Sequence, residues 1–431
     1  MSSAATAATA AAVPAAAKVA SRRRRRRIFV GTRRSVETVP AFVSRAGRRG
    51  AARASSTAAS GGDGGDPASQ RNDTDASGSD SRSPDDARDA AVASFPAEIR
   101  AVVADGADAA LRTVDARLAL AMKGEAADRG AADDDEVSAR ERAARFAEAE
   151  DEAVQIVRCL KSSGSLRGFG AARLVPKRDY ALSELKLNDI EAEKLLAPTE
   201  STIAGLRDAV SKALLALAGA WVFAAHPDGR QLAGALAAAG GALATDQIAF
   251  GGGVEALALD TAAQATSPAY VSRLRLHEAA HFLVAYLMGI LPKGYTLSSL
   301  DAFREYGALN VQAGCAFCDG EFQREVARGK IGSASLGRFS CVALAGIGME
   351  YVAYGYAEGG VSDVRQLDGM LRALAFSQKK SDSEVRWAVL NVITILRRHE
   401  PIVRALADAM ARGATVGTCV RLIEEKLGED I

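Results

Sequence analysis

The sequence predicts a mainly α-helical fold with a small β element, preceded by a helical region and a disordered N-terminus. Two observations support this prediction. From Ser267 onward, apolar residues recur at helical spacing in successive segments that end at glycine, proline or polar residues. Only two short segments of this part, "KGYTLSSL" and "GALNVQAG", have the character of strands. The expected helices cover residues 272–288, 336–356, 362–376, 381–399 and 401–412.

Residues 1–58 have the composition of a transit peptide. Residues 1–62 contain thirteen Lys and Arg, six of them in the run Arg22–Arg27, against one acidic residue. Basic, acid-poor segments rich in Ala and Ser are typical of organelle targeting. The composition favours the chloroplast, in the stroma or at the surface of a thylakoid or envelope membrane. A nucleic-acid-binding arm is the alternative. Because no aromatic residues alternate with the arginines, no nucleic-acid partner is expected.

Two further segments precede the most apolar part of the chain. Residues 59–92 are an acidic linker, rich in Gly and Ser, with too little apolar surface to fold. Residues 93–200 form a helical region. Apolar residues at helical spacing predict two or three surface helices between Pro96 and Lys161, and a further helix over residues 183–196.

Residues 201–262 are expected to form an apolar helical hairpin. Two apolar runs, 213–225 and 232–244, flank the turn sequence "HPDGRQ". Each run is shorter than the roughly 20 residues that cross a bilayer, and Ala and Gly dominate both. A buried hairpin is therefore expected. A membrane hairpin or an interfacial anchor is the alternative.

The segment "RLHEAAHFL" contains the H-E-x-x-H motif of zinc hydrolases. The chain has only 4 His, so the motif is expected by chance only about 0.002 times. On a helix, His277 and His281 lie one turn apart and present two imidazoles on one face. Glu278 can then reach a water on the ion and act as general base. The alternative is a packed helix with two ordinary histidines.

A catalytic zinc site needs a third protein ligand. No third His follows at metzincin spacing, since Pro292 occupies that place. A carboxylate is therefore required. Asp363 and Asp368 in "GGVSDVRQLDG" and Glu350 in the preceding expected helix are the candidates.

Residues 263–431 resemble the protease domain of the FtsH family. The resemblance rests on "RLHEAAHFLVAYLMG", "RFSCVALAGIGMEYVAYG" and "EGGVSDVRQLDGMLRAL". It is closest to the plant and algal chloroplast FtsH-like proteins that lack the ATPase module, with which the chain shares "GILPKGYTLSSL" and "LNVQAG". Ala280 replaces the glycine of the family's H-E-A-G-H motif, and no G-x-x-x-x-G-K-[ST] phosphate-binding loop is present.

The resemblance implies a zincin-like, zinc-dependent metalloendopeptidase that cleaves plastid proteins or peptides without its own motor. It places Asp363 on the family's aspartate ligand, and Asp363 also opens an expected helix whose N-terminus favours its charge. Glu350 would orient a ligand without touching the ion. A homo-oligomer or a separate ATPase partner is compatible with this family. The alternative function is a catalytically silent interaction or membrane-complex protein. Cys315 and Cys318 form a C-x-x-C that is expected to lie in a loop, with a redox pair as the alternative.

Overall fold

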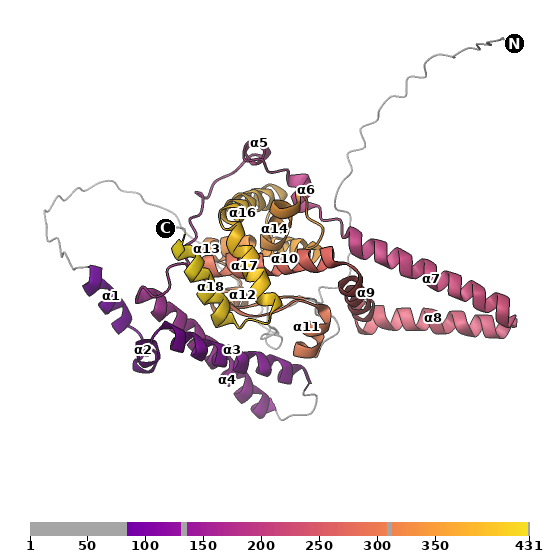
Figure 1. Cartoon of the computed structure of the whole chain (residues 1–431), viewed down its shortest axis with the longest axis horizontal. Helices are drawn as coiled ribbons and strands as arrows, with labels where there is room; N and C mark the ends of the chain where they lie inside the picture. Colours follow the sequence, from indigo (N-terminus) through magenta and orange to yellow (C-terminus); the bar gives the residue numbers. More distant parts are fainter. Residues whose placement is uncertain (1–83, 131–135, 308–312, 430–431) are drawn as a thin grey trace, which may run out of the picture. The chain divides into compact units, whose positions relative to one another are not determined.

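The computed structural model describes residues 84–130, 136–307 and 313–429 (Figure 1). Helices dominate these residues and one two-stranded sheet is found among them, as the sequence predicts. The predicted transit peptide, residues 1–58, lies outside the described residues, as does most of the predicted acidic linker.

The described N-terminal part is helical. Its helices are α1 (Pro84–Ala93), α2 (Ala97–Ala104), α3 (Ala107–Gly130), α4 (Glu136–Ser162), α5 (Leu182–Leu187) and α6 (Ala192–Leu196). The acidic linker predicted over residues 59–92 is too long at its C-terminal end, because α1 begins within it. Pro84 suits the first position of this helix, and alanines, which favour helix, follow it. The helix predicted over 183–196 is two short helices, α5 and α6. The predicted surface helices α3 and α4 instead contribute Leu118 and Ile156 to the main core.

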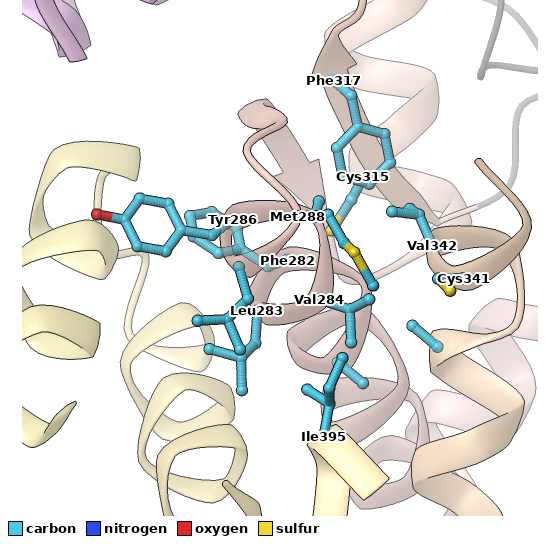
Figure 2. Close-up of a cluster of buried hydrophobic side chains, with 14 of the residues drawn as sticks. Phe282, Leu283, Val284, Tyr286, Met288, Cys315, Phe317, Cys341, Val342 and Ile395 are labelled. Atoms are coloured by element: carbon cyan, nitrogen blue, oxygen red, sulfur yellow. The ribbon is translucent and has the colours of Figure 1, made fainter. Parts of the chain in front are cut away.

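The C-terminal domain surrounds one buried helix, α10. Its elements are α10 (Pro268–Leu287), β1 (Leu291–Thr296), α11 (Ser299–Tyr306), β2 (Gly314–Cys318), α12 (Gly320–Ala327), α13 (Ser333–Ala343), α14 (Ala345–Tyr354), α15 (Val361–Ala373), α16 (Gln378–Arg398), α17 (Glu400–Ala411) and α18 (Val416–Glu429). Every residue of α10 from Leu276 to Leu287 is buried. This stretch is apolar except for His277, Glu278 and His281, and a mostly apolar helix needs neighbours all round. Helices α13, α14, α16 and α17 pack against it. Figure 2 shows Phe282, Leu283 and Val284 among these neighbours.

The two strands form an antiparallel pair beside α10. Leu291 pairs with Cys318 and Thr296 with Gly314, with an irregularity between Pro292 and Gly294. The strand predicted in "KGYTLSSL" is thus confirmed in its first half, and most of "GALNVQAG" lies outside the described residues. The C-x-x-C lies on β2, so its expected place in a loop is wrong. Small and apolar residues pair there against β1, and the described cysteines are free thiols.

The helix predicted over residues 336–356 is broken in two. Helices α13 and α14 meet at Leu344 and are bent by 42° relative to each other. Two glycines at the start of α14 bring its backbone against neighbours: a Cβ at Gly348 would lie 2.7 Å from Val392 of α16, and one at Gly346 would lie 2.1 Å from His277 of α10. The periodic apolar pattern continues through Leu344, so it could not predict the bend.

The apolar hairpin consists of α7 (Ser201–Ala225) and α8 (Gly229–Ala249), followed by α9 (Gly253–Thr266). Asp228 caps α8 by accepting hydrogen bonds from the backbone N–H groups of Arg230 and Gln231. No residue of α7 or α8 is buried. The expectation of a buried hairpin is therefore wrong. Both helices are also longer than the apolar runs that predicted them, since polar residues at their ends continue the helical geometry.

Candidate metal centre

Helix α10 places His277 and His281 side by side. The residues are four apart, and their ring centroids lie 4.8 Å from each other. Both side chains are buried, with 6% and 7% of their surface exposed. The helix begins at Ser267, whose hydroxyl accepts a hydrogen bond from the Tyr270 N–H, and Pro268 follows in the first turn. The predicted pair of imidazoles on one helix face is thus present.

Asp363 brings a carboxylate oxygen to this pair. It lies in the first turn of α15, after Gly360. Its Oδ2 is 3.0 Å from Nε2 of His277 and 3.4 Å from Nε2 of His281. One donor atom from each of the three residues lies within 4.8 Å of the others. Two imidazole nitrogens and one carboxylate oxygen are a donor set that suits zinc and leaves a fourth position open.

The other two predicted carboxylates do not join this cluster as donors. Asp368 faces away and forms an ion pair with Arg372 at 2.9 Å on the exposed side of α15. Glu350 of α14 lies behind His277, with its Oε1 2.8 Å from Nδ1 of that ring. The structure therefore separates the three candidates, and only Asp363 reaches both imidazoles.

Glu350 holds the His277 ring in place. Its Oε2 accepts hydrogen bonds from the backbone N–H groups of Glu358 and Gly359 at 2.7 and 3.0 Å, and Arg273 is 3.1 Å away. Burial raises the pKa of Glu350, but hydrogen bonds and charge, above all from His277, outweigh it and lower this pKa to about 2. A carboxylate on Nδ1 fixes the ring so that Nε2 faces Asp363.

A main-chain carbonyl orients the second imidazole. Nδ1 of His281 lies 2.8 Å from the carbonyl oxygen of Val342. Because a carbonyl only accepts, Nδ1 donates the hydrogen bond, and Nε2 is the ring nitrogen that faces Asp363. Val342 lies in the last turn of α13, two residues before Leu344, at which α13 and α14 meet. The end of α13 thus orients the His281 ring.

The charges of the cluster are strongly coupled. Burial lowers the pKa of His277, but its hydrogen bonds to Asp363 and Glu350 outweigh this and raise it well above the ordinary value. Burial raises the pKa of Asp363, but the two imidazoles lower it far below its usual range. In the metal-free protein a proton on His277 thus satisfies two carboxylates. A divalent cation at the same donors would replace that positive charge.

Glu278 has the burial, the unpaired oxygen and the raised pKa that are expected of a general base. Its side chain is buried, with 3% of its surface exposed, and its Oε2 has no hydrogen-bond partner among the described residues. Burial raises the pKa of Glu278, against the lowering effect of the nearby imidazoles. The thiol of Cys315 on β2 donates a hydrogen bond to the Glu278 carbonyl at 3.3 Å, which links the sheet to α10. A buried, unpaired carboxylate oxygen beside a metal donor set fits a water-activating base.

Glycines provide the space for the cluster, and sequence reasoning did not single them out. A Cβ at Gly346 would lie 2.1 Å from Nε2 of His277. Gly360 has φ +80°, and a Cβ there would lie 2.3 Å from Ile347 and 3.0 Å from Asp363 Oδ2. The "AGIG" and "EGG" segments were the available signals. Arg273, one turn before His277, was also missed, although a cation at that spacing on the motif helix is visible in the sequence.

Comparison with known proteins adds no assignment. No protein-family model matches the chain, and no curated protein or solved structure is detectably similar to it. The geometry of His277, His281 and Asp363 shows that this cluster could hold a metal ion.

Proposed function

We propose that the chain is a zinc-dependent metalloendopeptidase with an FtsH-type, zincin-like catalytic domain. The observation that carries the proposal is the convergence of Nε2 of His277, Nε2 of His281 and Oδ2 of Asp363 on one point, beside the unpaired Oε2 of Glu278. A surface pair of histidines would have neither the buried orienting partners nor the buried unpaired carboxylate.

Each residue has a distinct role in this proposal. His277, His281 and Asp363 would hold zinc, which supplies Lewis acidity to a carbonyl group and to water. Glu278 takes a proton from the attacking water and passes it to the leaving amine. Glu350 keeps the His277 ring turned toward the ion. Of the three ligands, Asp363 is the one with a partly exposed side chain, 21%, so a substrate would approach from its side.

The substrates we propose are loosely structured segments of plastid proteins, or peptides. The chain has no Walker A sequence, and without such a module the domain cannot unfold a folded substrate by itself. A separate ATPase partner or a homo-oligomer is compatible with this proposal. The basic, acid-poor composition of residues 1–58 supports a chloroplast location as part of this proposal. Fusing these residues to a reporter and testing its import into isolated chloroplasts checks the location. Failure of import and processing would contradict it.

The function is tested by removing the base while keeping the metal. Glu278→Gln preserves the side-chain shape but cannot accept a proton, and Glu278 is not one of the three converging donors. We expect hydrolysis of unfolded casein or a fluorogenic peptide to fall about 10²–10⁴-fold, with zinc content unchanged. The matched control is Glu321→Gln, an exposed Glu that pairs with Arg158 at 3.7 Å. Equal activity in the two variants would place the chemistry elsewhere.

A further inference from the structure

Helices α7 and α8 expose an apolar surface that nothing in the described chain covers. Large side chains there are mostly in contact with solvent, including Leu215 at 73%, Phe223 at 81% and Leu236 at 67% exposure. The bent pair α13–α14 has a comparable hydropathy, but its residues are packed in the core. Exposed apolar surface of this extent indicates a covering environment outside the chain.

The apolar surface surrounds each helix. Residues 213–225 and 232–244 contain no charged side chain and no polar one. Leu214, Leu215 and Leu217 point in three directions around α7, because successive residues are turned by about 100°. A helix that lies flat on a membrane, or that binds a partner with one face, has an opposite polar face. These two apolar runs have none, so their surroundings must be apolar on all sides, as in a lipid bilayer.

The lengths and the charges fit a hairpin that crosses a bilayer. Helices of 25 and 21 residues extend about 37 and 31 Å at about 1.5 Å per residue, and the hydrocarbon layer is about 30 Å thick. Among the unbroken helices of the described residues, only α7 is long and apolar enough to cross a membrane by itself, so α8 would enter the bilayer as its hairpin partner. The charged residues of α7 all lie in its first half, at Arg207, Asp208 and Lys212, and those of α8 lie near its two ends, at Arg230 and Asp246. Lys212, near the middle of α7, pairs with Asp208 at 2.6 Å, and its long stem can carry the ammonium group toward the headgroups. Asp228 and Arg230 lie at the turn. Burying their charges in hydrocarbon would be costly, so the turn is expected to lie outside the hydrocarbon layer.

We propose that residues 201–249 insert into a lipid bilayer as a helical hairpin, with the turn at Asp228 on the opposite side from the C-terminal domain. The start of α7 is tied to that domain. Glu358 accepts hydrogen bonds from the Ser201 hydroxyl and the Thr202 N–H at 2.8 and 2.6 Å, and pairs with Arg273 of α10 at 3.3 Å. Insertion therefore holds the metal centre close to the membrane. This inference does not depend on whether that centre is catalytic.

The test is made with the full chain and vesicles of phosphatidylcholine. The chain has 2 Trp: Trp221 is on α7, 42% exposed, and Trp387 is in the core, 4% exposed. We expect the chain to float with the vesicles and to resist extraction by carbonate. Lipids brominated in the acyl chains should quench Trp221 fluorescence, measured as the difference between the wild type and Trp221→Phe. The core residue Trp387 then needs no substitution.

A charge placed in the middle of the hairpin should prevent insertion. We expect the vesicle-bound fraction of the double variant Leu215→Lys, Leu236→Lys to be at least tenfold lower than that of the wild type. The control is Leu187→Lys on α5, which is 82% exposed outside the hairpin and should still float. Absence of flotation, or binding that salt or carbonate reverses, overturns the proposal. Lipid-independent dimers in which Trp221 is already shielded would overturn it as well, because a second copy would then cover the hairpin.

Discussion

Nε2 of His277 lies 3.0 Å from Oδ2 of Asp363, although 86 positions separate the two residues in the chain. Helix α10 carries the first and the first turn of α15 carries the second. Both atoms are also close to Nε2 of His281. Three donors from two distant segments are thus brought to one point that fits a single ion.

Variants of Asp363 and Asp368, which both lie on α15, test which residue is the third zinc ligand. We expect Asp363→Ala to lose bound zinc, because only two imidazoles would remain. Asp368→Ala should keep about one zinc per chain, because Asp368 pairs with Arg372 on the exposed side. Elemental analysis after gel filtration measures both. Zinc loss in Asp368→Ala, or full retention in Asp363→Ala, would show that the assignment is wrong.

A substitution at Gly346 tests whether zinc binding needs the close approach of α14 to His277 of α10. We expect Gly346→Ala to displace the His277 ring and abolish zinc binding, because the new Cβ would lie 2.1 Å from Nε2. The control is Gly369→Ala in α15, where a Cβ would meet no atom within 4 Å. That change should leave zinc bound and stabilise the protein by about 0.5–1 kcal/mol, the difference between Ala and Gly in a helix. Normal zinc content in Gly346→Ala would exclude this contact.

Glu350 tests the orientation of His277. Replacing it by Gln should weaken zinc affinity about 10–100-fold, the usual effect of losing a partner that orients a ligand. Chelator competition measures the affinity. Glu384 is a suitable control because it is also buried, with 6% exposure, but pairs with Lys177 at 2.8 Å. If Glu384→Gln weakens zinc binding as much, the effect of Glu350 is general destabilisation.

Asp319 predicts a pH dependence of stability away from the metal centre. Burial raises the pKa of Asp319 to about 7, with a smaller contribution from the charge of Glu150, while Gln323 opposes it. The Asp319 carboxyl of the unfolded chain has a pKa of about 4. Between this pH and about 7, the carboxyl is therefore protonated in the folded state but ionised in the unfolded chain. This destabilises the fold progressively as pH rises from about 4 to 7. The full effect is on the order of 4 kcal/mol, at about 1.4 kcal/mol per pKa unit.

The variant Asp319→Asn removes this ionisation. Its melting temperature should be close to that of the wild type at pH 5 and several degrees higher at pH 8. Scanning calorimetry at the two values measures the difference. Parallel pH profiles for the two proteins would show that Asp319 keeps an ordinary pKa in the folded state.

Local patterns in the sequence were sufficient for part of the fold and of the candidate site. Helical spacing predicted α10, and the motif on it predicted the adjacent imidazoles of His277 and His281. The approach of Asp363 could be expected only from the resemblance and from its place at a helix start, since no local pattern encodes a contact across 86 positions. The bend at Leu344 was missed because it depends on the close approach that Gly346 and Gly348 allow between helices.

Composition alone could not decide the surroundings of the hairpin. A helix that is apolar on every side is equally consistent with a protein core and with lipid. In this chain the run 213–225 of α7 and the stretch 276–287 of α10 are both mostly apolar, yet four helices bury the stretch in α10, whereas no residue of α7 is buried. The difference arises from long-range packing, which no window of residues around Leu215 contains.

Zinc bound by two histidines and one aspartate is the feature on which the proposed function depends. X-ray absorption at the zinc edge of the purified full chain tests it most directly. We predict a first shell of nitrogen and oxygen at about 2.0–2.2 Å that includes two imidazoles and no sulfur. Absence of zinc, or zinc–sulfur scattering at about 2.3 Å from Cys315 and Cys318, would contradict the account.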